Sequence, residues 1–395
     1  MEVFLLSEKN VSKEIPSLYS LALSFLRLGV TAFGGPAMIA YIRKMSVEEK
    51  KWLDDETFRD GIALCQSIPG ATAIQSSAYV GLKARGVPGA LVSFISFGLP
   101  AFLFMMILSS LYLKGHNMTE VISTFNGLQA IVVSIVANAT LVIGRNYIKN
   151  WKAIIIALFS CVMYSFKVNP IFIIILSGLL GVLFYYKESS DEIKEPVKKE
   201  KSSFKGFFIV LSFIFIFFLI LYLTSSQLFH LAILMSRIDM FAFGGGFASL
   251  PIMLHEIVQV RRWMDEKTFL NGIAMGQITP GPIVITATFI GYIIYGPLGG
   301  LVSTISIFSP SFLFVIGIEP YFNRLRRSPV VNKALRGILC SFAGILLMST
   351  IKFGIDIPWD TARIFLVIAS FISLLLKVDI PWIVLLGSVI SIFIL

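Results

Sequence analysis

Two helix-breaking sequences, each present twice, are the part of this chain whose residues best suit binding chemistry. Phe33-Gly34-Gly35 returns as Phe243-Gly244-Gly245, and Pro69-Gly70 returns as Pro280-Gly281. Proline removes a helix hydrogen bond, and glycine lowers the cost of leaving helical geometry. A helix that restarts after a break presents free N–H groups and a positive dipole end, which attract an anion. A packing kink is the alternative for any one break, and the repetition of both kinds favours a site.

Two arginines accompany the breaks. Arg27 and Arg237 each lie six residues before a Phe-Gly-Gly sequence, inside an apolar segment. An arginine inside a membrane is costly and is a candidate for function, and its planar guanidinium suits a tetrahedral oxyanion. The alternative is an ion pair, for which Asp239 is the obvious partner of Arg237. We therefore predict that both arginines bind the anion, and that Arg27 contributes more because Asp239 can neutralise Arg237.

Other polar residues give weaker signals. Gln66 and Gln277 lie three residues before Pro69 and Pro280 and could donate to the anion, or could form ordinary interhelical hydrogen bonds. Asp60 and Asp239 are the acids that we consider for proton coupling. The histidines and cysteines form no cluster with ligand spacing, so we predict no metal, no cofactor and no catalytic nucleophile.

The breaks belong to a long internal repeat. Residues 52–70 and 263–281 are identical at 10 of 19 positions with an offset of 211, and residues 91–104 and 301–314 at 9 of 14 with an offset of 210. Each 19-residue segment opens with a tryptophan and an acidic pair, which is typical of a membrane anchor followed by a helix start. A duplicated unit of this size in an apolar chain is typical of secondary transporters.

Composition places the repeat in a membrane. The chain has 395 residues, of which 56% are apolar and 14% charged, and its mean hydropathy is +0.84. A soluble domain carries about 25% charged residues. Long apolar runs without strand-type alternation predict an all-α polytopic membrane protein rather than a β-barrel. Basic loops on the cytoplasmic face explain the net charge of +10 better than nucleic-acid binding does.

We predict four parts in the chain: an N-terminal repeat (1–186), a charged cytoplasmic linker (187–205), an unpaired span (206–227) and a C-terminal repeat (228–395). About 13 apolar spans are expected, near 18–42, 57–82, 87–113, 119–145, 151–166, 169–186, 206–223, 228–252, 268–294, 297–318, 331–353, 360–376 and 380–395.

The number of spans predicts the topology. Six spans return the chain to its starting side, and the unpaired span then inverts the second repeat. On this arrangement 21 lysines and arginines fall on the starting side and 8 on the other, which places the N-terminus in the cytoplasm and the C-terminus outside. Whether the 18–42 segment is a kinked span or a re-entrant one stays open.

At the two breaks and the 52–70 segment, the chain resembles the chromate ion transporter family in its long, two-domain form. The resemblance covers both halves, although Pro69-Gly70-Ala71 stands where the family commonly has Pro-Gly-Pro. It implies transport of chromate, often as efflux that confers chromate resistance, with sulfate as the natural analogue.

The residues and the resemblance together predict a secondary transporter for chromate or a sulfate-like oxyanion in the cytoplasmic membrane. Membrane lipid is a second expected partner, nucleic acid is not expected, and a homodimer is a further candidate. The alternatives are a passive anion channel and a membrane-embedded enzyme acting on lipid-linked substrates. The substrate site would comprise Arg27, Phe33, Gly34, Gly35, Gln66, Pro69, Gly70, Arg237, Phe243, Gly244, Gly245, Gln277, Pro280 and Gly281.

Overall fold

The computed structural model describes residues 15–33, 35–115, 118–186 and 205–395, and all regular elements in these ranges are helical. The first repeat contains α1 (Leu18–Thr31), α2 (Gly35–Arg43), α3 (Asp55–Ser67), α4 (Thr72–Gly115), α5 (Thr119–Tyr147), α6 (Trp151–Ser165) and α7 (Pro170–Phe184). Between the repeats lies α8 (Lys205–Thr224). The second repeat contains α9 (Ser226–Met240), α10 (Ser249–Met253), α11 (Glu266–Ile278), α12 (Thr286–Ile318), α13 (Phe322–Arg326), α14 (Pro329–Ile355), α15 (Thr361–Leu375) and α16 (Ile380–Ile394).

The two repeats match in their local structure. Helices α6 and α15 begin and end 210 residues apart, as do α7 and α16, while α3 and α11 are offset by 211. The acidic residues predicted to start α3 and α11 do cap them: Asp54 accepts a hydrogen bond from the N–H of Thr57 (2.8 Å), and Asp265 from that of Thr268 (2.9 Å). A π-helical turn continues α2 over Lys44–Glu49 and α10 over Leu254–Val260.

The apolar helices fall into two length classes. Helices α4, α5, α8 and α14, and the 283–326 segment that contains α12, are long and apolar enough to cross a membrane. The shorter apolar helices have 10–17 residues, below the roughly 20 residues that a perpendicular span needs. The prediction of an all-α polytopic membrane protein is confirmed.

The first two predicted spans of the first repeat fold as hairpins of half-helices. Arg85, at the kink in α4, donates to the carbonyl of Pro16 just before α1 (2.8 Å). Its neighbour Lys83 pairs with Glu319 beyond α12 (2.5 Å), and Asp60 near the start of α3 pairs with Arg326 of α13 (3.1 Å). These groups therefore lie on one side of the molecule, here called the α1 side. The 18–42 segment is thus re-entrant.

In the second repeat, the corresponding hairpins open to the opposite side. Glu256, after α10, accepts a hydrogen bond from Asn169 in the connection between α6 and α7 (3.1 Å). Asn271 of α11 donates to Tyr112 near the end of α4 (3.2 Å). Two loops therefore lie on the side opposite to the one predicted. The loop at 43–51, with four basic residues, lies on the α1 side, and the loop at 261–267, with three, lies on the other side. Because each hairpin returns to the side on which it begins, 22 lysines and arginines now fall on the α1 side and 7 on the opposite side.

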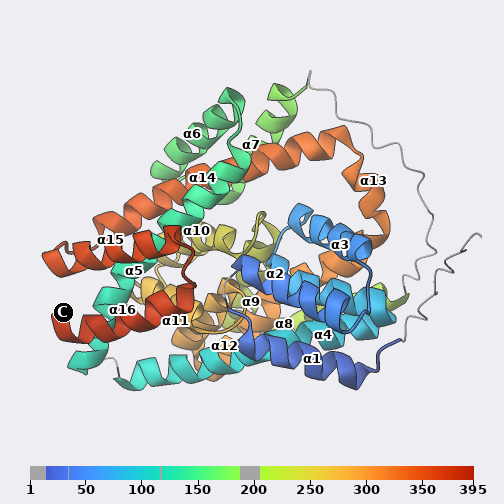
Figure 1. The fold of residues 1–395 in the computed structure, drawn as a ribbon, viewed down its shortest axis with the longest axis horizontal. Coiled ribbons are helices and arrows are strands. Elements are labelled where there is room, and N and C mark those ends of the chain that lie inside the picture. Colours follow the sequence, from blue (N-terminus) through green and yellow to red (C-terminus); the bar gives the residue numbers. More distant parts are fainter. Residues whose placement is uncertain (1–14, 34, 116–117, 187–204) are drawn as a thin grey trace, which may run out of the picture.

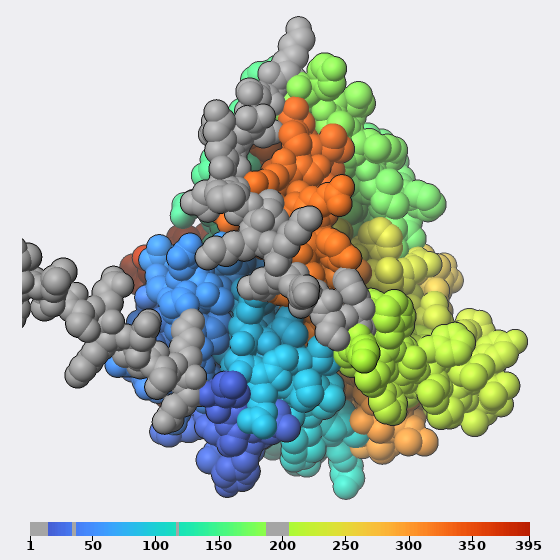
Figure 2. Space-filling view, turned by 90° about the vertical axis from the view of Figure 1, so that its right-hand side faces the viewer, coloured from blue at the N-terminus to red at the C-terminus, as the bar shows by residue number. Residues whose placement is uncertain are grey.

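The repeats are inverted and exchange helices. In Figure 1, α1 begins on the right, whereas α16 ends on the left. Helix α5 packs against α15 and α16 of the second repeat, and α14 packs against α6 and α7 of the first. Figure 2 views the α1 side, where the orange segment of α13 and early α14 lies between the blue N-terminal helices and the green end of α7. Each repeat therefore completes the packing of the other.

Small residues allow this exchange. A β-carbon on Gly337 of α14 would lie 2.8 Å from the Cα of Gly181 in α7. A β-carbon on Gly344 would lie 2.0 Å from the carbonyl oxygen of Ala157 in α6. Helices in membranes associate by such close backbone approach, because lipid supplies no hydrophobic drive between them.

Candidate functional site

The breaks of one repeat are bonded to those of the other. The N–H of Gly70 donates to the carbonyl of Ala242 (2.9 Å), and the N–H of Gly281 donates to the carbonyl of Ala32 (3.1 Å). These two bonds are related by exchange of the repeats, as a two-fold arrangement requires. The four residues are called the crossing point below. The two kinds of break that the sequence singles out thus meet at one place.

Only glycine fits the Pro-Gly positions of the crossing point. Gly70 and Gly281 have φ of +118° and +102°, a region that residues with a β-carbon rarely adopt. A β-carbon on Gly70 would lie 1.9 Å from the Ser311 hydroxyl, and one on Gly281 would lie 2.8 Å from the Ala101 β-carbon. Ser311 and Ala101 are 210 residues apart, so each repeat covers the other's break with the same helix.

Helix N-termini gather around the crossing point. A β-carbon on Gly245 would lie 3.9 Å from the hydroxyl of Thr72, the first residue of α4. A β-carbon on Gly246 would lie 2.8 Å from the side chain of Ile283, which begins the turn before α12. The first N–H groups of a helix have no partner inside it and carry its positive partial charge. The carbonyls of Ala32 and Ala242 after α1 and α9 are already bonded, so the backbone groups here that can serve a ligand include N–H donors at the starts of α4 and α12.

Arg237 is engaged in an ion pair, but with a different partner from the one predicted. Its guanidinium donates to Glu256, which is 2% exposed and also receives Arg261. The expectation that Asp239 would be the partner is wrong. Asp239 instead accepts from the backbone N–H and the hydroxyl of Ser311 (2.8 and 2.7 Å). The reason is the hairpin, which brings the turn after α10 back alongside α9.

Arg27 has no such partner. Its side chain is exposed on α1, and the structure gives it no ion pair with any described residue. Met45 occupies the position 211 residues before Glu256 and is buried. Ser20, Ser24 and Thr31 share the Arg27 face by helical spacing, which makes a polar stripe along α1. The first repeat therefore carries, six residues before Phe33, a cation that no described acid neutralises.

The two predicted glutamines lie in different environments. Gln66 is exposed near the end of α3, whereas Gln277 is buried near the end of α11. The Gln277 side-chain nitrogen has no hydrogen-bond partner among the described residues. A buried donor without an acceptor is costly, so the Gln277 amide is available to an acceptor group of a ligand.

The helices that carry these glutamines are also buried to different extents. Residues 269–277 of α11 are all buried, and Asn271 links it to α5 and α4 through Gln129 (2.9 Å) and Tyr112 (3.2 Å). In α3, Glu56, Arg59 and Gln66 are exposed. Exposed charges on a membrane helix bundle face water or lipid headgroups rather than hydrocarbon. The molecule is therefore accessible along α3 and closed along α11.

The remaining predicted residues are placed as follows. Phe33 and Phe243 are half-buried, Pro69 and Pro280 are buried, and Gly244 and Gly245 have positive φ. Gly35 is the first residue of α2, and Gly34 lies outside the described residues. Thus the structure brings the Pro-Gly and Phe-Gly-Gly breaks together, whereas Arg27 and Gln66 lie on exposed surfaces.

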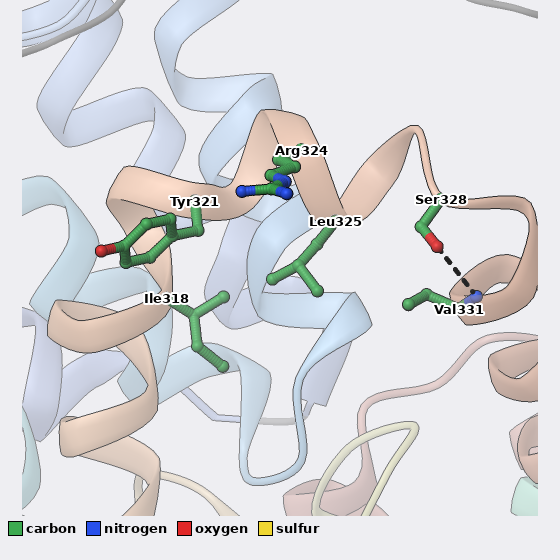
Figure 3. Close-up of a pocket in the computed structure, with 6 residues that line it drawn as sticks. All are labelled: Ile318, Tyr321, Arg324, Leu325, Ser328 and Val331. Atoms are coloured by element: carbon green, nitrogen blue, oxygen red, sulfur yellow. Dashed lines mark hydrogen bonds between the residues drawn. The ribbon is translucent and has the colours of Figure 1, made fainter.

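A surface pocket of about 420 Å³ lies between the end of α12 and the start of α14 (Figure 3). Ile318 of its lining is seven residues along α12 from Ser311, roughly 10 Å at 1.5 Å per residue. Arg324 is the one charged residue of the lining, which is completed by Ile318, Tyr321, Leu325, Ser328 and Val331. The pocket therefore does not belong to the site around the breaks.

Sequence reasoning missed four residues that organise this region. Glu256, Gln75, Ser311 and Asn271 are all buried polar groups. Ser311 lies in a repeated segment, and Glu256 follows an apolar stretch in which an acid is unusual. Both facts were available as signals. Asn271 also lies in a repeated segment, whereas Gln75 has no such signal, because neither its position nor its spacing shows that it would meet Ser311 of α12.

The comparisons with known proteins agree with this geometry. A sequence model of the family described as "Chromate transporter" matches residues 19–182 and 229–392, two stretches exactly one repeat apart. An uncharacterized transporter of Methanocaldococcus jannaschii is 42% identical over 390 residues, covering 98% of this chain and 97% of the relative. A chromate transport protein of Cupriavidus metallidurans is 28% identical, covering 93% and 91%. A probable chromate transport protein of Synechococcus elongatus is 30% identical, covering 86% and 85%. No solved structure matches the chain.

Proposed function

The chain belongs to the chromate transporter family, and from this premise we propose that it is a secondary transporter that moves chromate or a sulfate-like oxyanion across the cytoplasmic membrane. The observation that carries the proposal is the crossing point, where breaks of two inverted repeats are joined by reciprocal backbone bonds. Inverted repeats with broken helices at their interface are the usual construction of secondary transporters.

A tetrahedral dianion suits the charges around the crossing point. Two half-helix ends offer about +0.5 charge each, which leaves roughly one positive charge to be supplied. Arg237 is held in an ion pair with Glu256, which it shares with Arg261, whereas Arg27 has no acidic partner among the described residues. We therefore assign Arg27 the role of attracting the anion, Gln277 that of a buried donor, and the backbone of Gly70, Gly245 and Gly281 that of close approach.

Alternating access fits the difference between α3 and α11. In this state an anion would reach the crossing point along the exposed face of α3, while the Asn271 network holds α11 against α5. If α11 became exposed and α3 became buried, the crossing point would open to the opposite side of the membrane. A passive channel would instead need a continuous polar path beside α11, whose residues 269–277 are buried.

Orientation and direction form part of the proposal. The basic residues favour a cytoplasmic α1 side. An anion entering along α3 would then come from the cytoplasm, which corresponds to efflux. The four-part division of the chain, with its cytoplasmic linker and unpaired α8 span, is part of the same arrangement.

Radiolabelled flux tests this function directly. Purified protein in vesicles of known orientation should accumulate labelled chromate or sulfate, and unlabelled anion on the far side should accelerate that movement. Acceleration by exchange is expected of a carrier and not of a channel. Anion movement absent for both substrates, or product formation from lipid-linked substrates, would contradict the proposal.

A further inference from the structure

Asp239 is a membrane-embedded acid that the anion site does not use. It is fully buried in α9, one position before the residue that ends the helix. Its Oδ2 accepts two hydrogen bonds from Ser311 of α12, from the N–H (2.8 Å) and from the hydroxyl (2.7 Å). Its Oδ1 accepts none from any described residue. One oxygen of the carboxyl group is therefore committed, and the other is buried and free.

Gln75 of α4 extends the cluster. Its side-chain nitrogen donates to the carbonyl of Pro69 (2.6 Å) and to the Ser311 hydroxyl (3.4 Å). Its side-chain oxygen has no partner in the described part of the chain. The cluster thus connects the end of α9 to the Pro-Gly break of the first repeat, and it contains two buried acceptor oxygens that lack a donor.

Among the residues that the structure describes, none places a positive charge in an ion pair with Asp239. Arg237, on the same helix, is paired with Glu256 from the turn after α10. Helix α12 carries no charged residue, and its titratable side chains Tyr292 and Tyr295 lie more than three turns from Ser311. In α8 the one charged residue is Lys205, at its start, and α10 has none. An unpaired buried carboxylate costs several kcal/mol even after relaxation, so burial favours the neutral form of this acid, in which Oδ1 is the oxygen available to carry the proton.

The position of this acid ties it to the crossing point. The carbonyl of Asp239 accepts from the N–H of Ala242 (3.1 Å), and the carbonyl of Ala242 accepts from Gly70 (2.9 Å). Ser311 covers Gly70 so closely that a β-carbon there would lie 1.9 Å from its hydroxyl. Any rearrangement that separates the breaks must therefore also change the hydrogen bonds of Asp239.

We propose that Asp239 carries the proton that couples anion movement to a pH gradient, an inference that rests on the proposed transport function. The acid holds its proton in the state seen here and releases it when the crossing point opens. The first repeat has no counterpart of this acid at the matched position, which is Gly29. A β-carbon on Gly29 would lie 2.5 Å from the carbonyl oxygen of Phe97, so no acid fits there.

Vesicle assays with Asp239→Asn test the proposal. The amide resembles the protonated acid but cannot release a proton. We expect wild-type protein to move labelled sulfate or chromate faster when a pH gradient is imposed, and Asp239→Asn to exchange labelled for unlabelled anion at the wild-type rate without responding to the gradient. Asp60→Asn, which removes the exposed acid paired with Arg326, should keep both properties.

Ser311→Ala supplies a second readout, which does not depend on tolerance of the amide. Alanine stands at the matched position 101 in the first repeat. Removing the hydroxyl weakens the hydrogen bonding of the ionised acid, so proton release becomes harder and the pH midpoint of transport should rise by about one unit. A purely structural role for Ser311 would lower the rate without moving the midpoint.

The possible results separate the two proposals. Absence of anion exchange in wild-type protein would contradict the transport function itself. The coupling role is overturned if wild-type flux ignores the pH gradient, if a sodium gradient accelerates it instead, or if Asp239→Asn still responds to pH. It is also overturned if Asp239→Asn loses exchange while the protein remains folded, because the acid would then be needed for movement rather than for coupling.

Discussion

In the second repeat, α11 is buried without interruption from Phe269 to Gln277, whereas four residues of α3 are buried in the first. Sequence explains part of this difference. Arg59 and Asp60 of α3 stand where α11 has Leu270 and Asn271. Burying an arginine and an aspartate costs far more than burying leucine and asparagine. The first repeat is therefore built to face water at this position.

Arg27 and Arg237 also differ between the two repeats, in whether an acid pairs with them. Glu256 holds Arg237 in an ion pair shared with Arg261, and buried Met45 stands at the matched position, so that no described acid pairs with Arg27. The two copies of the repeat therefore differ in function on our proposal. The first copy offers a cation without a described acidic partner and an exposed approach for the anion, and the second supplies a fixed ion pair, a closed face and the buried acid Asp239. The following experiments alter these differences one at a time.

Changing the crossing point should have the largest effect. We expect Gly70→Ala to abolish anion flux, because the β-carbon collides with Ser311 and a non-glycine residue at this φ costs on the order of 1–3 kcal/mol in addition. Gly86→Ala is the matched control: Gly86 also has positive φ (+64°), but open space surrounds its β-carbon position. Flux at matched amounts of folded protein measures the effect. Equal activity of the two variants would mean that the Gly70 break is only a bend.

Removal of the second repeat's acid should reduce stability. Glu256→Gln leaves Arg237 and Arg261 facing one another without a carboxylate. Because the acid is buried and both arginines are half-exposed, the loss is on the order of 1–3 kcal/mol. We expect a lower unfolding temperature in detergent, and a partial recovery when Arg237→Gln is added. Met45→Leu at the matched position keeps a buried apolar side chain and should change stability less. A larger loss for Met45→Leu would contradict the assignment of the pair to the second repeat alone.

Transferring the acid to the first repeat should weaken anion binding. Met45→Glu places a carboxylate where it can neutralise Arg27, in the manner of Glu256 and Arg237. We expect the apparent affinity for chromate or sulfate to fall about tenfold, or 1.4 kcal/mol, and Arg27→Gln to add little further loss to this variant. Initial rates of uptake over a range of anion concentrations provide the measurement. Unchanged affinity in folded Met45→Glu protein would show that the two positions are not equivalent.

Much of the fold could be predicted from the sequence, because the same helix starts and helix breaks are present in both repeats. The helix starts at Asp54 and Asp265 and the breaks at Pro69 and Pro280 were predictable from capping and from proline chemistry. The sides of two loops were not, because a re-entrant hairpin and a kinked span have the same apolar pattern. Contacts such as Asp60 with Arg326 were needed to tell them apart.

The site was predictable in its backbone and less so in its side chains. Glycine and proline favour particular backbone conformations, so the breaks could be predicted from the sequence, and both kinds of break lie at the crossing point. The partner of Arg237 did not follow from proximity along the chain, because the nearest acid, Asp239, is taken by Ser311. Long-range polar contacts of this kind depend on helix packing, which neither spacing nor composition encodes.

On our proposal, the first repeat's arginine binds the anion while the second repeat's arginine is structural. Apparent affinities of Arg27→Gln and Arg237→Gln for chromate and sulfate, measured in vesicles at matched amounts of folded protein, distinguish these roles. We predict that Arg27→Gln loses about tenfold or more, or 1.4 kcal/mol, with partial recovery in Arg27→Lys, which keeps the charge without the planar fork. Arg237→Gln should retain the wild-type affinity despite lower stability. Equal losses in both variants, or a loss confined to Arg237→Gln, would contradict the division of roles between the repeats.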